Sequence, residues 1–222
     1  MSCCPENSVP YLDAVDVESG SVVTIDGYSY YKTNEKSDNK LGVLIIPDIF
    51  GWNGGRTRFI ADIFAKNGYM AVIPKFLDPP LDGGTDGDGL PSNFDFATRR
   101  PEFGPYITTF PYAVLSPKIK GGIKLLKEAG VEKIGIIGFC WGGWLLTHFF
   151  SDPELPEEVK AGAIPHPSIT TIEDNLFKGD SVSLSSKIQR PILLLPAGND
   201  PDSYRLEGDV YLAMKVSDSF MT

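Results

Sequence analysis

The residues best suited to do chemistry form the hexapeptide GFCWGG at residues 138–143. It matches the nucleophile elbow G-x-S-x-G, with Cys140 in the position of the serine. The turn is sharp, so side chains two positions before and two after the nucleophile would collide with neighbouring backbone. At the start of a helix the dipole favours a thiolate, and the backbone N–H of Trp141 is free to face a developing oxyanion. The pattern predicts a cysteine nucleophile.

The alternative for Cys140 is a buried structural cysteine in an ordinary strand-to-helix turn. An apolar strand is predicted just before the motif, at residues 133–138, and an amphipathic helix just after it, at residues 142–150. The elbow needs this context on both sides, and the context therefore favours it.

A catalytic acid is expected at the end of a later strand, because the elbow's fold orders its groups as nucleophile, acid and histidine. The predicted strand at residues 191–196 runs into a tight turn that contains Asp200. A purely turn-forming aspartate is the alternative, since Asn-Asp-Pro is common turn chemistry. The position favours Asp200 as the acid, and Asp202, further round the turn, is the lesser candidate.

The loop after the predicted strand at residues 41–47 is expected to supply a second oxyanion donor, the N–H of Ile49. Asp48 is expected close to Cys140, where its carboxylate could hold or deprotonate the thiol. The alternative for Asp48 is a helix-capping or turn residue.

The elements that position these groups alternate between strand and helix, which predicts an α/β fold with a mostly parallel, doubly wound sheet. Ligands of such a sheet bind at the carboxyl ends of its strands. The expected hairpin has strands at 21–25 and 28–32; further strands are expected at 41–47, 69–74, 133–138, 160–164 and 191–196, and helices at 55–67, 114–129, 142–150 and 204–216.

Residues 78–111 interrupt this rhythm with paired prolines, paired glycines and several aromatic residues. A long insert of this kind is a disordered segment or a binding loop. Disorder at residues 82–93 and a partly ordered cap over a pocket both remain open. The length of 222 residues suits one domain spanning residues 1–222 with this insert.

Composition excludes several classes of protein. The formal net charge is −9 and the isoelectric point about 4.7, so nucleic acid and anionic membrane are not expected partners. The three cysteines form no C-x-x-C or zinc-like group, and no secretory signal or membrane-spanning run is readable. A cytoplasmic protein is expected, and its oligomeric state is not predicted.

Four segments together resemble the dienelactone hydrolase family of the α/β-hydrolase superfamily: MSCCP at 1–5, IPDIFG at 46–51, GFCWGG at 138–143 and AGND at 197–200. The resemblance implies the α/β-hydrolase fold and a Cys–His–Asp triad. It also implies hydrolysis of a small ester or lactone through an acyl-thiol intermediate, with no cofactor and no metal. Cys140 and Asp200 match the nucleophile and the acid.

Two positions depart from the family's prototype. Asp48 stands where the prototype has glutamate beside the thiol. The segment KFLDPP at 75–80 offers no arginine for a substrate carboxylate, which argues against dienelactone itself as the substrate.

No histidine follows Asp200, and the chain contains only His148 and His166. The resemblance therefore predicts a C-terminally truncated member, without its last strand, last helix and triad histidine, and with an exposed sheet edge. His148 is expected to pack beneath the elbow. His166, at the end of strand 160–164, lines the pocket, forms a turn or acts as a substitute base.

Three functions stay open. The favoured one is a cysteine hydrolase impaired by the missing histidine. The others are a non-catalytic relative that binds a small apolar ligand, and a reactive-thiol protein in which Cys140 takes part in redox or acyl-transfer chemistry.

Overall fold

The computed structural model describes residues 19–34, 37, 39–52, 56–84 and 87–215. The segment MSCCP at 1–5 and the last residue of the helix expected at 204–216 lie outside the described residues. Strands and helices alternate along most of the chain, in the order β1 (Ser21–Ile25), β2 (Tyr28–Lys32), β3 (Leu41–Ile46), α1 (Thr57–Lys66), β4 (Met70–Pro74), α2 (Arg100–Thr108), α3 (Tyr112–Glu128), β5 (Lys133–Gly138), α4 (Trp141–Phe150), β6 (Val159–Pro165), α5 (Ile169–Glu173), α6 (Ser181–Ser185), β7 (Ile192–Leu195) and α7 (Asp209–Lys215).

The described strands form one sheet in the order β1-β2-β4-β3-β5-β6-β7. β1 and β2 make the predicted antiparallel hairpin, whose turn residues Asp26 and Gly27 both have positive φ. From β4 to β7 all neighbours are parallel. The α/β class predicted from the alternating pattern is confirmed.

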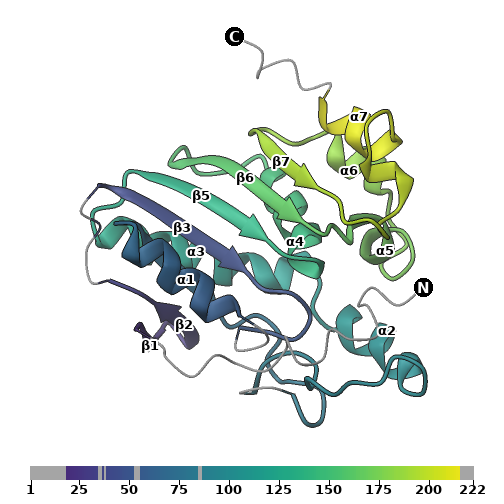
Figure 1. Cartoon of the computed structure of the whole chain (residues 1–222), viewed down its shortest axis with the longest axis horizontal. Coiled ribbons are helices and arrows are strands. Elements are labelled where there is room, and N and C mark those ends of the chain that lie inside the picture. The colour runs from purple at the N-terminus through teal and green to yellow at the C-terminus, as the bar shows by residue number, and fades with distance from the viewer. Residues whose placement is uncertain (1–18, 35–36, 38, 53–55, 85–86, 216–222) are drawn as a thin grey trace.

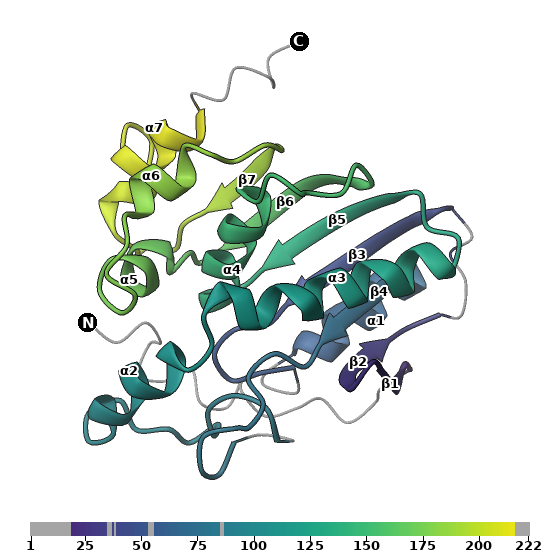
Figure 2. The same cartoon turned by 180° about the vertical axis from the view of Figure 1, so that it is seen from behind.

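Helices cover both faces of the sheet. α1 lies in front of it in Figure 1, and α3 and α4 lie on the opposite face, which comes forward in Figure 2. Every residue of β4 and nearly every residue of β3 is buried, which explains why these strands read as continuous apolar runs. The main core lies between the sheet and α3 and α4, and a smaller cluster lies under α1.

The insert is ordered in most of its length, so disorder at residues 82–93 is wrong for the part that the structure describes. Asp88 and Leu90 are fully buried. α2 was not predicted, because Pro101 and Pro105 break the periodicity from which a helix is recognised in sequence. Figure 2 places α2 at the carboxyl-end side of the sheet.

The C-terminal part of the chain needs a second correction. Instead of one helix over 204–216, a 3₁₀ turn at Asp202–Tyr204 precedes α7 at Asp209–Lys215. Gly208 separates them, and a Cβ there would lie 2.3 Å from the Asp202 carbonyl oxygen. The short helices α5 and α6 were also not predicted, since five residues are too few to show a helical period.

β7 forms one edge of the sheet, and two of its four side chains face solvent on one face. Leu193 is 59% exposed and Leu195 is 46% exposed. Among the described residues, the β7 edge of the sheet therefore exposes two leucine side chains.

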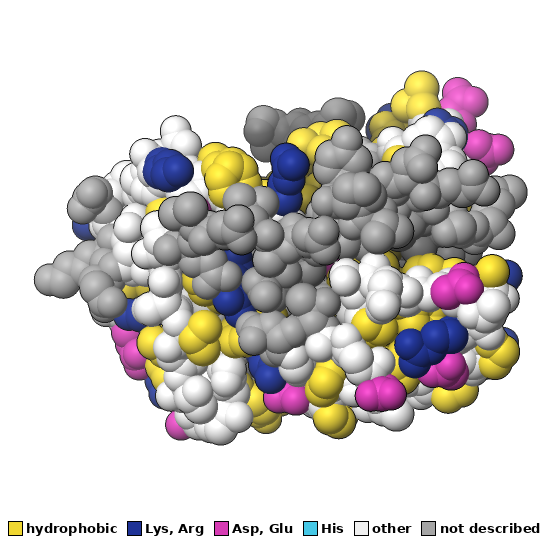
Figure 3. Space-filling model, turned by 60° about the horizontal axis from the view of Figure 1, so that its bottom comes forward, with side chains coloured by type: hydrophobic (Ala, Val, Ile, Leu, Met, Phe, Trp, Pro, Cys, Tyr) yellow, Lys and Arg dark blue, Asp and Glu magenta, His cyan; other side chains and the backbone are white. Residues whose placement is uncertain are grey.

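Among the described residues, no helix is both long and apolar enough to cross a bilayer. Figure 3 shows the underside of the view in Figure 1, and there the described hydrophobic, basic and acidic side chains are interspersed.

Candidate functional site

Cys140 lies between β5 and α4 with the backbone geometry of a strained turn. Its φ is +52° and its ψ is −111°, a region that non-glycine residues rarely adopt. The surroundings hold it there: its N–H donates to the Pro165 carbonyl oxygen at 3.2 Å, and its carbonyl accepts from the N–H of Gly143 at 3.0 Å. The side chain is 8% exposed. The thiol therefore sits where the elbow pattern predicts.

The glycines of the elbow are required by close backbone contacts. A Cβ at Gly138 would lie 2.4 Å from the Gly142 carbonyl oxygen, and one at Gly142 would lie 2.5 Å from the Ile46 carbonyl oxygen. The collision predicted from the sequence is therefore real on both sides of Cys140.

Substitution of Gly142 by alanine is expected to lower the free energy of unfolding by about 3 kcal/mol, because the clash is with backbone that cannot rotate away. Gly135→Ala in β5 is the matched control, since its Cβ would lie 4.0 Å from the nearest atom, the Ala161 carbonyl oxygen. We expect that control to be neutral or stabilising by up to about 1 kcal/mol. Urea unfolding of both variants gives the two values, and equal costs would contradict this account.

Two backbone amides are available near the elbow. Trp141 is the first residue of α4, and Ile49 lies in the loop after β3. The backbone N–H of neither residue donates a hydrogen bond within the described part of the chain. The two segments meet, because Gly142 packs against the carbonyls of Ile46 and Pro47. A pair of free amides beside a nucleophile is the arrangement that stabilises an oxyanion.

The thiol contacts a residue that sequence reasoning missed. The Sγ of Cys140 lies 3.3 Å from the Oγ of Ser168, and the Ser168 N–H donates to the Cys140 carbonyl at 3.3 Å. Ser168 comes three residues after the end of β6, the parallel neighbour of β5. That position was the available signal, since the carboxyl ends of adjacent strands share one edge.

His166 and Asp200 form the second part of the site, at the carboxyl ends of β6 and β7. The Nδ1 of His166 lies 2.7 Å from the Oδ1 of Asp200, whose side chain is 4% exposed. The second carboxylate oxygen of Asp200 accepts the N–H of Ala197 at 2.6 Å. The buried Nδ1 makes no aligned hydrogen bond to any described residue, so the contact has the distance of an ion pair without the angle of a hydrogen bond.

The backbone of His166 is also constrained. Its φ is +54°, and its N–H donates to the Leu195 carbonyl at 2.9 Å, next to the end of β7. The structure thus brings His166 to Asp200. Within the described contacts it does not bring either residue to the Sγ of Cys140, whose partner is Ser168.

Asp48 lies in the loop after β3 and accepts the N–H of Phe50 on its Oδ1 at 2.8 Å. Burial raises the pKa of Asp48 to about 6, against the opposing effects of that hydrogen bond and of nearby His166. Contacts among the described residues do not include one between Asp48 and Cys140. The turn role left open by the sequence is therefore present, and the carboxyl group is near His166.

Asp48→Asn is expected to raise the free energy of unfolding at pH 7 by about 1–2 kcal/mol, because it removes a carboxylate that is costly to bury. The folded pKa of about 6 lies above the unfolded value of 3.8. Between these values the folded state holds the extra proton, so the wild-type protein loses stability as the pH rises from about 4 to 6. Urea unfolding at pH 4, 5 and 7 should show a gain from Asp48→Asn that grows with pH, and a pH-independent difference would contradict it.

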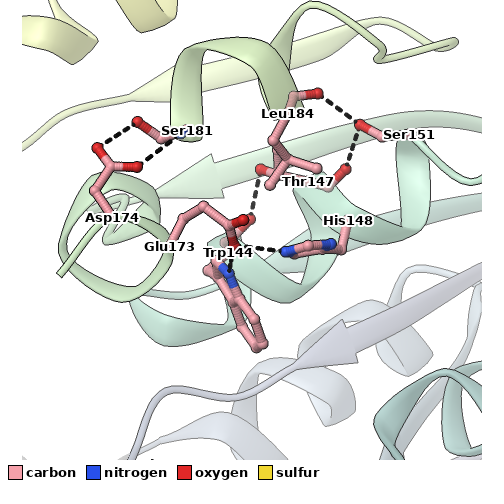
Figure 4. A network of polar contacts seen from close by, with 9 residues as sticks. Trp144, Thr147, His148, Ser151, Glu173, Asp174, Ser181 and Leu184 are labelled. Carbon is pink, nitrogen blue, oxygen red and sulfur yellow. Dashed lines mark hydrogen bonds and ion pairs between the residues drawn. The ribbon is translucent and has the colours of Figure 1, made fainter. Parts of the chain in front are cut away.

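A second polar network lies at the far end of α4 and is drawn in Figure 4. The carboxylate of Glu173 on α5 accepts the Nε1–H of Trp144 at 2.7 Å and lies 2.7 Å from the Nε2 of His148. These bonds hold the pKa of Glu173 below its usual range, chiefly through His148. His148 also stacks on Tyr112. This confirms a packing role for His148.

A cavity of about 470 Å³ opens beside this network, between α3, α4 and α6, and it is lined by His148 and Tyr112 among others. None of Cys140, Ser168, His166 and Asp200 lines it, so it is not the substrate pocket expected at the elbow. No group of three His, Cys, Asp or Glu residues within the described ranges is placed to hold a metal ion.

Comparison with known proteins supports the resemblance. A model of the "Dienelactone hydrolase family" matches residues 25–205. The chain is 33% identical over 159 residues to a "Carboxymethylenebutenolidase homolog" of Xenopus tropicalis, covering 70% of this chain and 58% of that protein. The human homologue is 32% identical over 132 residues, covering 58% of this chain and 49% of that one. The chain thus spans between about half and three fifths of the length of these relatives.

Solved structures with the same architecture support the fold alone. A dienelactone hydrolase-like promiscuous phosphotriesterase from metagenomic libraries superposes with a TM-score of 0.55 at 18% identity, covering 88% of this chain and 74% of that one. A thioesterase domain from the curacin biosynthetic pathway gives 0.54 at 12% identity, with 90% of each chain covered. The sheet and its helices have the α/β-hydrolase fold, and the chain belongs to the dienelactone hydrolase family.

Proposed function

We propose that this chain supplies the cysteine nucleophile of an ester or lactone hydrolase, and that the substrate acylates Cys140. The observation that carries the proposal is the thiol held at positive φ at the start of α4, where the elbow packs against the end of β3 and its loop. Within the described part of the chain, the amides of Trp141 and of Ile49 in that loop donate no hydrogen bond. A residue kept in a strained backbone conformation by its surroundings is typical of a functional position. The relatives named carboxymethylenebutenolidase homologue support a lactone or small ester as the substrate class.

In the acylation step, the sulfur of Cys140 attacks the substrate carbonyl carbon and a C–S bond forms. The carbonyl oxygen becomes an oxyanion that the amides of Ile49 and Trp141 stabilise. The C–O bond to the leaving group then breaks, and the leaving alkoxide takes up the proton that the thiol has lost, so that an alcohol is released. Water attack on the thioester releases the acid and regenerates the thiol.

The second step needs a base that activates water. We propose that His166, oriented by Asp200 at 2.7 Å, supplies acid–base chemistry in this sequence. The ring has no described contact with the thiol, and its contact with Asp200 is poorly aligned. Both features support slow release of the acyl group, so the proposed activity is a hydrolase impaired in deacylation.

A burst experiment tests this function. On mixing the 222-residue protein with p-nitrophenyl acetate, we expect about one equivalent of nitrophenol, followed by slow turnover. Intact-mass measurement after the burst should show a single added acetyl group. Digestion should then locate it on the peptide that contains Cys140. Absence of both would support the non-catalytic ligand-binding alternative. Iodoacetamide then separates that alternative from a reactive-thiol protein, because only a reactive thiol is alkylated rapidly.

A further inference from the structure

Asp88 is a fully buried carboxylate in the insert, and it bonds two separate loops. Its Oδ2 accepts the N–H of Trp52 at 2.8 Å, and its Oδ1 accepts the N–H of Leu77 at 2.6 Å. Trp52 lies in the loop after β3 that carries Ile49, and Leu77 lies just after β4. A buried carboxylate that accepts two backbone amides fixes both of them, since leaving either unpaired is costly.

The backbone on both sides of Asp88 also packs on the Ile49 loop. The N–H of Leu90 donates to the Ile49 carbonyl at 2.8 Å. A Cβ at Gly89 would lie 2.6 Å from that same carbonyl oxygen, and a Cβ at Gly51 would lie 2.6 Å from the Asp88 carbonyl oxygen. Residues 88–90 and 49–52 are therefore in direct backbone contact along their length.

From this geometry we propose that Asp88 is a positioning residue for the oxyanion loop: it holds residues 49–52 so that the Ile49 N–H faces the acyl oxygen at Cys140. The inference rests on the proposed function, because it assigns a task to the amide of Ile49. Asp88 itself touches neither the thiol nor the substrate and acts through the loop.

The charges around Asp88 agree with this role. Burial raises the pKa of Asp88 to about 6, while the bonds from Trp52 and Leu77 and the nearby ammonium groups of Lys118 and Lys75 act in the opposite direction. Lys118 on α3 is itself buried and donates to the Phe76 carbonyl at 2.7 Å. A further titratable group near Asp88 is Tyr106 on α2, whose hydroxyl donates to the Leu77 carbonyl at 3.1 Å.

The test compares two reactions of the same thiol. Acylation by p-nitrophenyl acetate creates an oxyanion. Alkylation by iodoacetamide creates none, because the sulfur displaces iodide from a saturated carbon. Both need the thiolate equally, so their ratio isolates the oxyanion loop. In Asp88→Asn one oxygen is replaced by an N–H₂ group that cannot accept. We expect the ratio of acylation to alkylation rate to fall about 10–100-fold, less than the roughly 10²–10³-fold seen when an oxyanion donor is removed, because the Ile49 amide is displaced and not lost.

The matched control is Asp62→Asn in α1. Asp62 is also buried and also accepts two hydrogen bonds, from the hydroxyl of Tyr31 at 2.7 Å and the N–H of Ser19 at 3.1 Å, away from the elbow. It should lower stability and leave the ratio unchanged. If Asp88→Asn does not fold, the same ratio is measured in Asp88→Glu, which keeps the carboxylate but shifts it by one methylene. A fall in the ratio is expected there too.

An unchanged ratio in the folded Asp88 variant, or an equal fall in the control, would overturn the proposal. The proposed function fails in a different way: the wild-type protein would then show no acylation at all, while alkylation proceeded.

Discussion

Cys140→Ala is expected to abolish the nitrophenol burst and the acetyl adduct, because the hydroxyl of the neighbouring Ser168 is a weak nucleophile with no described base in contact with it. Cys140→Ser keeps a nucleophilic atom at the same place but replaces a readily ionised thiol by an alcohol. A serine at an elbow needs a base in direct contact. The structure shows Ser168, not a histidine, against this position. We expect the serine variant to acylate at least about 100-fold more slowly than the wild-type protein.

The control for this prediction uses the other two cysteines of the sequence, Cys3 and Cys4. The double variant Cys3→Ser/Cys4→Ser should keep the full burst and a single alkylation by iodoacetamide. A burst that survives in Cys140→Ala and disappears in the double variant would place the chemistry elsewhere.

Much of this site could be predicted because the elbow is a local pattern. Gly138, Cys140 and Gly142 are close in sequence, and the close approaches that require glycine are short-range consequences of the turn. Asp200 was found in the same way, since it follows the apolar strand that became β7. The parallel sheet followed from alternation of strands and helices.

Contacts that form across the sheet edge could not be read from the sequence. Ser168 reaches the thiol from the loop after β6, and Asp88 reaches the Ile49 loop from within a glycine-rich insert that resembles disorder. Neither residue lies in a regular pattern of apolar residues from which its burial could be predicted. The expected contact between Asp48 and Cys140 was also inferred from proximity in topology, and the described contacts put the Asp48 carboxyl on its own turn instead.

The pairing of His166 with Asp200 gives these two residues an interpretation that the sequence left open. His166 stood as pocket wall, turn residue or base, and its positive φ and bond to Leu195 show that it does form a turn. The same turn places its imidazole on a buried carboxylate at the edge where Cys140 lies. A structural and a chemical role are thus compatible at this residue.

His166→Ala is expected to slow the turnover that follows the burst about 10–100-fold without changing the burst amplitude of one equivalent, because general acid–base assistance typically contributes about 10²–10⁴-fold and the poorly aligned pair supplies only part of it in deacylation. Asp200→Asn should have a similar effect through the orientation of the ring. The double variant should be little worse than either single one, since residues that act as a unit are not additive.

The chain contains a matched control for this pair. His148 lies 2.7 Å from the carboxylate of Glu173, the same distance as in the His166–Asp200 pair, but on the far end of α4 (Figure 4). His148→Ala and Glu173→Gln remove an equivalent partly buried pair and should change stability while leaving the turnover of the folded protein after the burst near its wild-type value. Equal slowing by both histidine variants would mean that the loss is structural. A turnover after the burst that is as fast in His166→Ala as in the wild-type protein would refute a role for His166 as the base.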